Sequence, residues 1–469
     1  MSNQDQDPKN QEVVENRALN IWEALIPIFA LVGMLAYNVL VFGDDALSGS
    51  NQFILLLGAA VAALVGFFNK TSFETMMEEV AQNIKSTAGA ILILLMVGAL
   101  AGTWLVSGII PTMIYYGLQI LNPSIFLAAC VVICAIISVA TGSSWTTSAT
   151  VGIALIGIAN ALGISLGMTA GAILSGAYFG DKLSPLSDTT NLAPAMAGTD
   201  LFTHIQYMLF TTVPTVSITL IVFIIIGLNI ETSGTADTSA ILASIDDAFT
   251  ISPWLFIVPA IVIFMIIKKT PPLIALLIGT ILGGIAALIF QPEIIAVLGG
   301  SESLTFESGY KGIMNAITVD TAIETTNENL NDLFAASGMA GMLGTIWLIL
   351  CAMTFGGVMD AIGALSRISA FMLNLFESTF GLFASTVATC IGLNATASDQ
   401  YLAIVVPGKM YAKAYKDKGL APENLSRTLE DSGTVTSVLV PYNTCGAYQS
   451  GVLGVSVADY FVYAIFNWL

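Results

Sequence analysis

A chain of 469 residues with only 10% charged and 56% hydrophobic residues cannot cover a water-facing surface, since a soluble domain carries about 25% charged residues. Its mean hydropathy of +0.84 and its repeated apolar runs instead indicate membrane-spanning helices. The net charge of −18 leaves no basic surface for nucleic acid, and runs such as Ile218–Ile226 lack the alternation of β-barrel strands.

The first 19 residues are polar and are predicted to be a cytoplasmic tail, without the features of a cleavable signal peptide. Eight apolar runs then have the length of membrane-spanning helices. They are Ile21–Phe42, Phe53–Phe68, Ala88–Val106, Tyr207–Leu228, Pro253–Ile267, Leu273–Phe290, Gly341–Met359 and Gly451–Leu469. Four further apolar stretches are interrupted by polar clusters, at residues 124–161, 168–196, 379–414 and 425–447. The chain is therefore predicted to be an all-α polytopic membrane protein.

The distribution of lysine and arginine predicts the orientation, because these residues concentrate in cytoplasmic loops. Basic residues occur at Lys268–Lys269 and, most densely, at residues 409–427. The connections at residues 43–52, 231–250 and 291–337 carry a single lysine between them and are predicted to lie outside. This pattern places the N-terminus in the cytoplasm of a plasma-membrane protein.

An internal repeat divides the chain. Residues 86–145 align without a gap on residues 341–400, and 13 of the 60 pairs are identical. Ala88–Val106 should run outward and Gly341–Met359 inward, so the two copies have opposite orientation, as in transporters built from inverted repeats. The expected division is a first repeat, a connecting helix with an external loop, and a second repeat, at residues 20–205, 206–250 and 251–469.

Two polar clusters, Thr141–Thr147 and Asn394–Asp399, interrupt apolar helices at matching places in the two copies. We predict that they are the tips of re-entrant hairpins at 124–161 and 379–414, the first open to the outside and the second to the cytoplasm. Hydroxyls, amides and freed carbonyls at such tips suit a dehydrated monovalent cation. The candidate ligands are Thr141, Ser143, Ser144, Asn394, Thr396, Ser398 and Asp399. The alternative is that these side chains only pack between helices.

Residues 180–194 place ionisable groups inside a predicted broken helix at 168–196, and an intramembrane charge is by default a functional candidate. A carboxylate there holds either H⁺ or Na⁺, so binding of one expels the other. Asp188 is the first choice for this exchange, with a sodium site near it, and Asp181 is the second. Further candidate ligands are Ser187, Thr189 and Asn191. Lys182 is the expected charge partner of Asp181 or Asp188, and the alternative is that this pair only holds the unwound helix.

A second broken helix is predicted at residues 425–447, in the place that 168–196 holds in the first copy. Its candidate ligands are Asp431 and Asn443. The alternative places Glu430 and Asp431 at the cytoplasmic surface. His204, the only histidine, is predicted to be a polar residue at the membrane interface, and the five cysteines are interpreted as small hydrophobic residues.

Residues 176–194 (GAYFGDKLSPLSDTTNLAP) and 198–205 (GTDLFTHI) resemble the NhaC-type sodium/proton antiporter family, and the likeness extends over most of the chain. The resemblance implies a place in the broader ion-transporter superfamily, with two hairpins and two broken helices in each protomer. It also implies a homodimer and an elevator mechanism. Some members of the family exchange sodium for protons, whereas others exchange malate for lactate or move amino acids.

The predicted function is secondary active exchange of Na⁺ for H⁺ by alternating access, with the lipid bilayer, Na⁺ and H⁺ as partners and no cofactor. The alternatives are a sodium- and proton-coupled exchanger of small organic acids such as malate and lactate, an amino-acid transporter of the same family, and an ion channel. The scarcity of intramembrane bases favours cation exchange, and paired inverted breaks favour alternating access. No metal-ligand cluster, nucleophile–histidine pair or phosphate-binding glycine motif indicates an enzyme.

Overall fold

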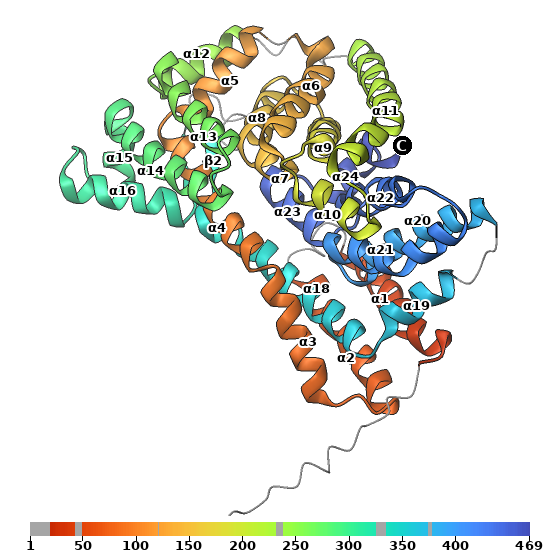
Figure 1. Ribbon diagram of the computed structural model, residues 1–469. Coiled ribbons are helices and arrows are strands. Elements are labelled where there is room, and N and C mark those ends of the chain that lie inside the picture. The colour runs from red at the N-terminus through yellow and green to blue at the C-terminus, as the bar shows by residue number, and fades with distance from the viewer. Residues whose placement is uncertain (1–18, 43–48, 121, 231–237, 325–333, 374–377) are drawn as a thin grey trace, which may run out of the picture.

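The computed structural model describes residues 19–42, 49–120, 122–230, 238–324, 334–373 and 378–469, so nearly all of the predicted cytoplasmic tail lies outside the described residues. Within these ranges the chain is almost entirely helical (Figure 1). One short antiparallel pairing joins β1 (Thr321–Ala322) to β2 (Ala335–Ala336).

The helices follow one another along the chain. The first eleven are α1 (Ile21–Phe42), α2 (Ser50–Phe68), α3 (Phe73–Ser86), α4 (Ala88–Val106), α5 (Ile109–Ile120), α6 (Pro123–Thr141), α7 (Ser144–Thr147), α8 (Ile153–Ala161), α9 (Leu166–Leu183), α10 (Asp188–Ala197) and α11 (Leu201–Asn229). The others are α12 (Thr238–Ala248), α13 (Ile257–Ile267), α14 (Pro272–Phe290), α15 (Pro292–Leu298), α16 (Phe306–Thr318), α17 (Gly338–Gly341), α18 (Leu343–Ala361), α19 (Ala364–Leu373), α20 (Thr379–Thr396), α21 (Gln400–Asp417), α22 (Pro422–Leu429), α23 (Thr444–Leu453), α24 (Val457–Phe461) and α25 (Ile465–Trp468). Two π-helical turns, Ser148–Gly152 and Glu430–Thr434, continue α7 into α8 and extend α22.

Eight helices in the described ranges are long and apolar enough to cross a membrane, or nine if the pair formed by α12 and the Pro253–Ile267 segment, bent by 84°, is one span. Helices α1 and α4 have the bounds that the sequence predicts, and α2, α11, α14 and α18 overlap four further predicted spans. The other two long apolar helices are α6 and α20, which the sequence assigns to the first arms of the hairpins. The prediction of an all-α polytopic membrane protein is confirmed.

The predicted span Gly451–Leu469 is wrong. Helix α23 ends at Leu453 because Gly454 adopts a left-handed conformation (φ 65°), which glycine reaches at little cost. Ser456 then accepts a hydrogen bond from the backbone N–H of Asp459 and starts the short helix α24. The apolar composition of this stretch therefore serves packing between α9, α24 and α25 and does not form a single spanning helix.

Large apolar side chains stay exposed along the long helices. Phe29 on α1 and Phe210 and Ile225 on α11 are 67%, 75% and 54% exposed. An exposed apolar surface of this extent is unfavourable in water but suits the hydrocarbon of a bilayer. The chain is a multi-pass membrane protein.

The folded chain brings segments from both ends of the sequence together. Figure 1 shows α2, α3 and α18 at one end, where α18 packs against both of the others. Helix α10 contacts α21 and α22, and α23 contacts α8. The interrupted stretches of the two halves therefore meet in the interior, although more than 200 residues separate them in the sequence.

Helices α6 and α9 pack very closely in this interior. A methyl group added at Gly176 in α9 would collide with the backbone carbonyl of Val131 in α6. The Ser138 hydroxyl donates a hydrogen bond to the carbonyl of Ala177 across the same contact. Small residues that let helix backbones approach are typical of packing in membranes, where burial of apolar surface drives association only weakly.

We expect Gly176→Ala to lower the melting temperature of the protein in detergent, because the added methyl meets backbone that cannot rotate away. Overpacking of this kind costs about 1–3 kcal/mol. The matched control is Gly392→Ala in α20, where no atom lies within 4 Å of the added methyl. The control should be neutral or stabilising, and equal destabilisation by both substitutions would contradict the close approach of α6 and α9.

Candidate functional site

The first helix break lies where the sequence predicts a hairpin tip. Helix α6 ends at Thr141 because Gly142 is left-handed (φ 72°), and a methyl group there would collide with Leu186. Ser143 is extended, and its hydroxyl accepts a hydrogen bond from the backbone N–H of Thr146. Serine in this position caps the next helix, so α7 starts at Ser144.

The second break separates α9 from α10. The chain is non-helical from Ser184 to Ser187, and the Ser187 hydroxyl caps α10 by accepting from the backbone N–H of Thr190 at 3.4 Å. The amide of Asn191 donates to the carbonyls of Pro185 and Ser187 at 3.0 and 2.7 Å. The exposed Asn191 therefore holds the break in shape.

Asp181 connects these two breaks. Its side chain is buried, and Oδ2 accepts hydrogen bonds from the hydroxyl and the backbone N–H of Ser144 at 2.6 and 3.2 Å. The Thr190 hydroxyl donates to the backbone carbonyl of Asp181 at 2.8 Å. A buried carboxylate thus lies between the first tip and the first broken helix.

The third break lies at residues 397–399, between α20 and α21, and the fourth lies directly before α23. Hydrogen bonds join these two breaks. Ser398 is left-handed (φ 56°), and its carbonyl accepts from the backbone N–H of Thr444 at 3.0 Å. Asp399 caps α21 by accepting from the backbone N–H of Leu402 at 2.9 Å. The amide of Asn443 donates to the carbonyl of Asn394 at 3.0 Å.

A cavity of about 550 Å³ lies between the four breaks. Its wall includes Thr141, Ser143, Trp145, Asp181, Ser187, Asp188, Thr189, Asp399, Gln400, Tyr401, Thr444 and Cys445. The connection between α3 and α4, at Ser86–Thr87, and the connection at Lys269–Pro272 complete it. Lys269 is the one lysine or arginine among the lining residues of the described chain. The cavity combines three carboxylates with several hydroxyl groups, which are suitable ligands for a hard cation.

The structure brings some of the predicted site residues onto this cavity and leaves others behind it. Thr141, Ser143, Asp181, Ser187, Asp188, Thr189 and Asp399 line the wall. Ser144 lies directly behind it, bonded to Asp181. The residues outside the lining are Asn191, Asn394, Thr396, Ser398, Asp431 and Asn443, and most of them bond to the backbone around the breaks. Burial also separates the two acids of the first broken helix, because Asp188 is exposed and Asp181 is buried.

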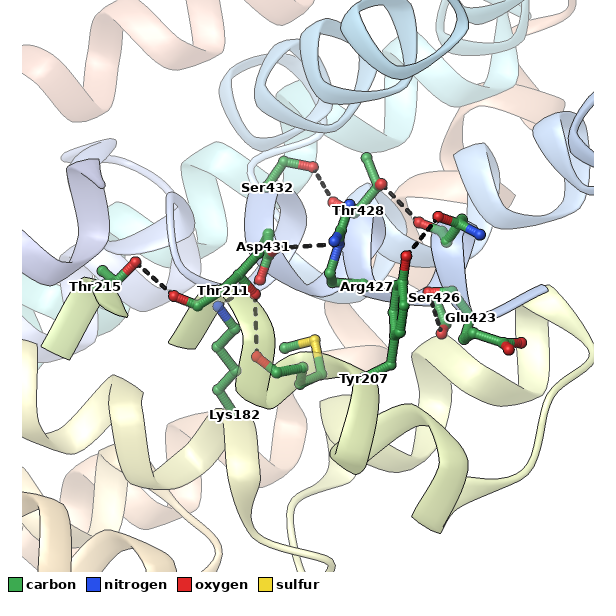
Figure 2. A network of polar contacts seen from close by, with 12 residues as sticks. Lys182, Tyr207, Thr211, Thr215, Glu423, Ser426, Arg427, Thr428, Asp431 and Ser432 are labelled. Carbon is green, nitrogen blue, oxygen red and sulfur yellow. Dashed lines mark hydrogen bonds and ion pairs between the residues drawn. The ribbon is translucent and has the colours of Figure 1, made fainter. Parts of the chain in front are cut away.

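The prediction that Lys182 pairs with Asp181 or Asp188 is wrong. Lys182 forms an ion pair with Asp431 in the second half of the chain (Figure 2). No ion pair joins Lys182 to Asp181 or Asp188. Consecutive residues on a helix point about 100° apart, so Asp181 faces the first tip while Lys182 faces the π-helical turn after α22. The Arg427 guanidinium lies 3.9 Å from the other oxygen of Asp431 and stacks over the ring of Tyr207.

Several buried residues that were not among the predicted ligands also join the two halves. Trp145 stacks on Tyr448 with ring centroids 3.9 Å apart. Glu430 is fully buried and accepts a hydrogen bond from the Thr189 hydroxyl at 2.9 Å, so the alternative that placed it at the cytoplasmic surface is wrong for Glu430. The adjacent acids Glu430 and Asp431 indicated a buried carboxylate in the sequence. The sequence does not tell which of two neighbouring side chains points inward.

His204 packs inside the protein. It is fully buried, and its Nδ1 lies 2.8 Å from the hydroxyl of Ser426 on α22. One turn further along α11, the Tyr207 hydroxyl donates to the side chain of Asn424 at 2.8 Å. The histidine therefore belongs to the contact between α11 and α22. All five cysteines are buried, in agreement with their interpretation as small hydrophobic residues.

Comparison with known proteins gives a consistent result. Residues 176–469 match the model of the Na⁺/H⁺ antiporter family. The Na⁺/H⁺ antiporter NhaC of Alkalihalophilus pseudofirmus is 37% identical over 415 residues, which cover 88% of this chain and 87% of that protein. The malate-2H⁺/Na⁺-lactate antiporter of Bacillus subtilis is 37% identical over 423 residues, covering 89% and 86%. The arginine/ornithine antiporter ArcD of Halobacterium salinarum is 32% identical over 450 residues, covering 94% and 88%.

We expect Lys182→Gln to lower the melting temperature in detergent markedly, because Asp431 then keeps only the more distant Arg427. Removing one partner of a buried ion pair costs about 3–5 kcal/mol, and the 26% exposure of Asp431 reduces this cost. The double variant Lys182→Gln/Asp431→Asn should recover part of the loss.

The matched control is Lys311→Gln, which breaks an ion pair with Glu307 whose side chains are 57% and 77% exposed. Exposed pairs contribute little to stability, so this variant should melt like the wild type. If Lys182→Gln melts like the control, the ion pair in the interior is not formed as described.

Proposed function

The chain belongs to the Na⁺/H⁺ antiporter family, and on this basis we propose that it exchanges Na⁺ for H⁺ across the cell membrane by alternating access. Its relatives are antiporters, so it is a transporter and not an enzyme. The observation that carries the proposal is the buried carboxylate of Asp181, which lies on the cavity between the first tip and the first broken helix.

The exchange follows from competition for this carboxylate. In a site shielded from water, an ionised Asp181 needs a positive partner, and either Na⁺ or H⁺ supplies it. The hydroxyls of Thr141, Ser143, Ser187 and Thr189 share the cavity wall and are the further ligands that we propose for Na⁺. Asp188 and Asp399 add negative charge to the same cavity, which raises the local concentration of cations.

We also propose the inverted-repeat organisation, with an elevator motion and a homodimer. Helices α4 and α18 begin 255 residues apart, at Ala88 and Leu343, and α6 and α20 end with the same offset. Gly108 and Gly363 also differ by 255 positions, and both are left-handed, with φ of 80° and 74°. These matches support repeats at residues 20–205 and 251–469, joined by 206–250, with hairpins at 124–161 and 379–414.

The residues that line the cavity are the basis on which we propose the side of the membrane to which it opens in this conformation. Its wall includes Ser86–Thr87 and Lys269–Pro272, in connections that the distribution of basic residues assigns to the cytoplasm. The cavity then opens inward, and the N-terminus lies in the cytoplasm. In this state the site would take up cytoplasmic Na⁺ and release H⁺.

We expect Asp181→Asn to abolish Na⁺-dependent proton movement in proteoliposomes loaded with a pH-sensitive dye. Asparagine keeps the shape of the side chain but holds neither a proton nor the negative charge that attracts Na⁺. The matched control is Asp200→Asn. Asp200 is exposed, caps α11 through Thr203, and is kept at a lowered pKa by the hydrogen bonds from Thr203.

The control should exchange at the wild-type rate, since asparagine is an equally good helix cap. Asp188→Asn should weaken the apparent affinity for Na⁺ without abolishing exchange, because Asp188 is exposed on the cavity wall. If Asp181→Asn exchanges at the wild-type rate and Asp188→Asn shows no exchange, the site lies at Asp188 instead.

A second candidate function is exchange of small organic acids. The cavity is much larger than a single dehydrated Na⁺ needs, and Lys269 on its wall is a suitable partner for a carboxylate. One of the relatives is named as a malate-2H⁺/Na⁺-lactate antiporter. Uptake of labelled malate into proteoliposomes loaded with lactate separates this function from exchange of cations alone.

A further inference from the structure

Glu430 lies at an unusual place in the backbone. It is the first residue of the π-helical turn Glu430–Thr434, which follows α22 and precedes the fourth helix break. Single π-helical turns are rare and occur frequently at functional sites, because they are less stable than an α-helical turn. The turn directs Glu430 into the protein, where its side chain is fully buried.

The hydrogen bonds of this carboxyl group are incomplete. Oε1 accepts a hydrogen bond from the Thr189 hydroxyl at 2.9 Å, whereas Oε2 has no hydrogen-bond partner among the described residues. The hydroxyl of Thr434, within the same turn, is likewise buried without a partner in the described part of the chain. The Thr434 hydroxyl can accept from a protonated Glu430 or donate to an ionised one, so hydrogen bonding alone does not select between the two forms.

Glu430 also has no counter-ion of its own. The charged residues that interact most strongly with it are Asp181, which repels a second negative charge, and Lys182. Lys182 is already paired with Asp431, and Figure 2 shows these two side chains meeting beside Arg427. A buried charge without a partner costs several kcal/mol, so the neutral acid is the stable form of Glu430.

A chain of hydroxyl groups connects Glu430 to the cavity. The Thr189 hydroxyl that contacts Glu430 lies 3.1 Å from the hydroxyl of Ser187. Both Thr189 and Ser187 line the cavity wall. A proton can therefore pass between Glu430 and the cavity through two side chains that both donate and accept hydrogen bonds.

We propose that Glu430 is a second proton-binding site of the transporter, which releases its proton through Thr189 and Ser187 when a cation enters the cavity. A positive charge near Asp181 stabilises the ionised form of Glu430 and so favours this release. This inference rests on the proposed function and deepens it, because it adds a second exchanged proton to the one that competes with Na⁺ at Asp181.

The test measures the ratio of protons to sodium ions in proteoliposomes by finding the membrane potential at which flux reverses, for the wild type and for Glu430→Gln. Glutamine mimics the protonated side chain and cannot release a proton. The expected result is that Glu430→Gln still moves Na⁺ but with one proton fewer in each cycle. The matched control is Glu423→Gln on α22, whose carboxylate points away from Asp431 in Figure 2 and should leave the ratio unchanged. An unchanged ratio in Glu430→Gln overturns the inference.

Infrared spectroscopy of the wild type labelled with ¹³C-glutamate gives a direct measurement that does not need a foldable Glu430→Gln. We expect the carbonyl band of a protonated glutamic acid at neutral pH, lost on addition of Na⁺ and shifted in Thr189→Val, which removes the donated hydrogen bond. Absence of that band in the wild type overturns the inference. A wild type that shows the band but no Na⁺-dependent proton movement overturns the proposed function instead.

Discussion

A helix interrupted inside an apolar environment leaves backbone N–H and C=O groups that water does not reach, so the protein itself must satisfy them. Each of the four breaks meets this requirement in the same way. The segment after each break begins with a side chain that accepts a hydrogen bond from its own first turn. These capping residues are Ser143, Ser187, Asp399 and Asn443. The breaks are thereby fixed in shape, and their remaining oxygen atoms become available to a ligand in the cavity.

The proposed site also takes residues from both halves of the chain, so neither half holds a complete site. The first half supplies Asp181 and Thr189, and the second half supplies Asp399 and Glu430. Some contacts between the halves are polar or aromatic, namely the ion pair of Lys182 with Asp431 and the stack of Trp145 on Tyr448. Such contacts depend strongly on geometry, because a buried polar group that loses its partner is costly. A small relative movement of the halves therefore changes the charge environment of the site.

The helix breaks could be predicted from the sequence because polar clusters inside apolar runs are costly in a membrane unless the backbone is interrupted there. The polar stretch beginning at Thr141 and the one around Asp188 both coincide with helix ends. Partners across the halves could not be predicted, because no local pattern relates Lys182 to Asp431. Apolar composition alone also led to the wrong prediction of one spanning helix at Gly451–Leu469. One left-handed glycine divides the chain there into short helices. Length and polarity therefore predict where elements start and stop, whereas pairing depends on the tertiary fold.

Some residues that hold the breaks do not face the cavity, and this bears on substrate choice. Asn191, Asn394 and Thr396 donate hydrogen bonds to backbone carbonyls and take no part in the cavity wall. A substitution on the wall, such as at Lys269 or Tyr401, therefore leaves the backbone hydrogen bonds of the breaks intact. One scaffold can then present different chemical groups to a ligand without losing its fold. This agrees with similarity over most of the chain to antiporters whose names give Na⁺, malate or arginine as the transported species.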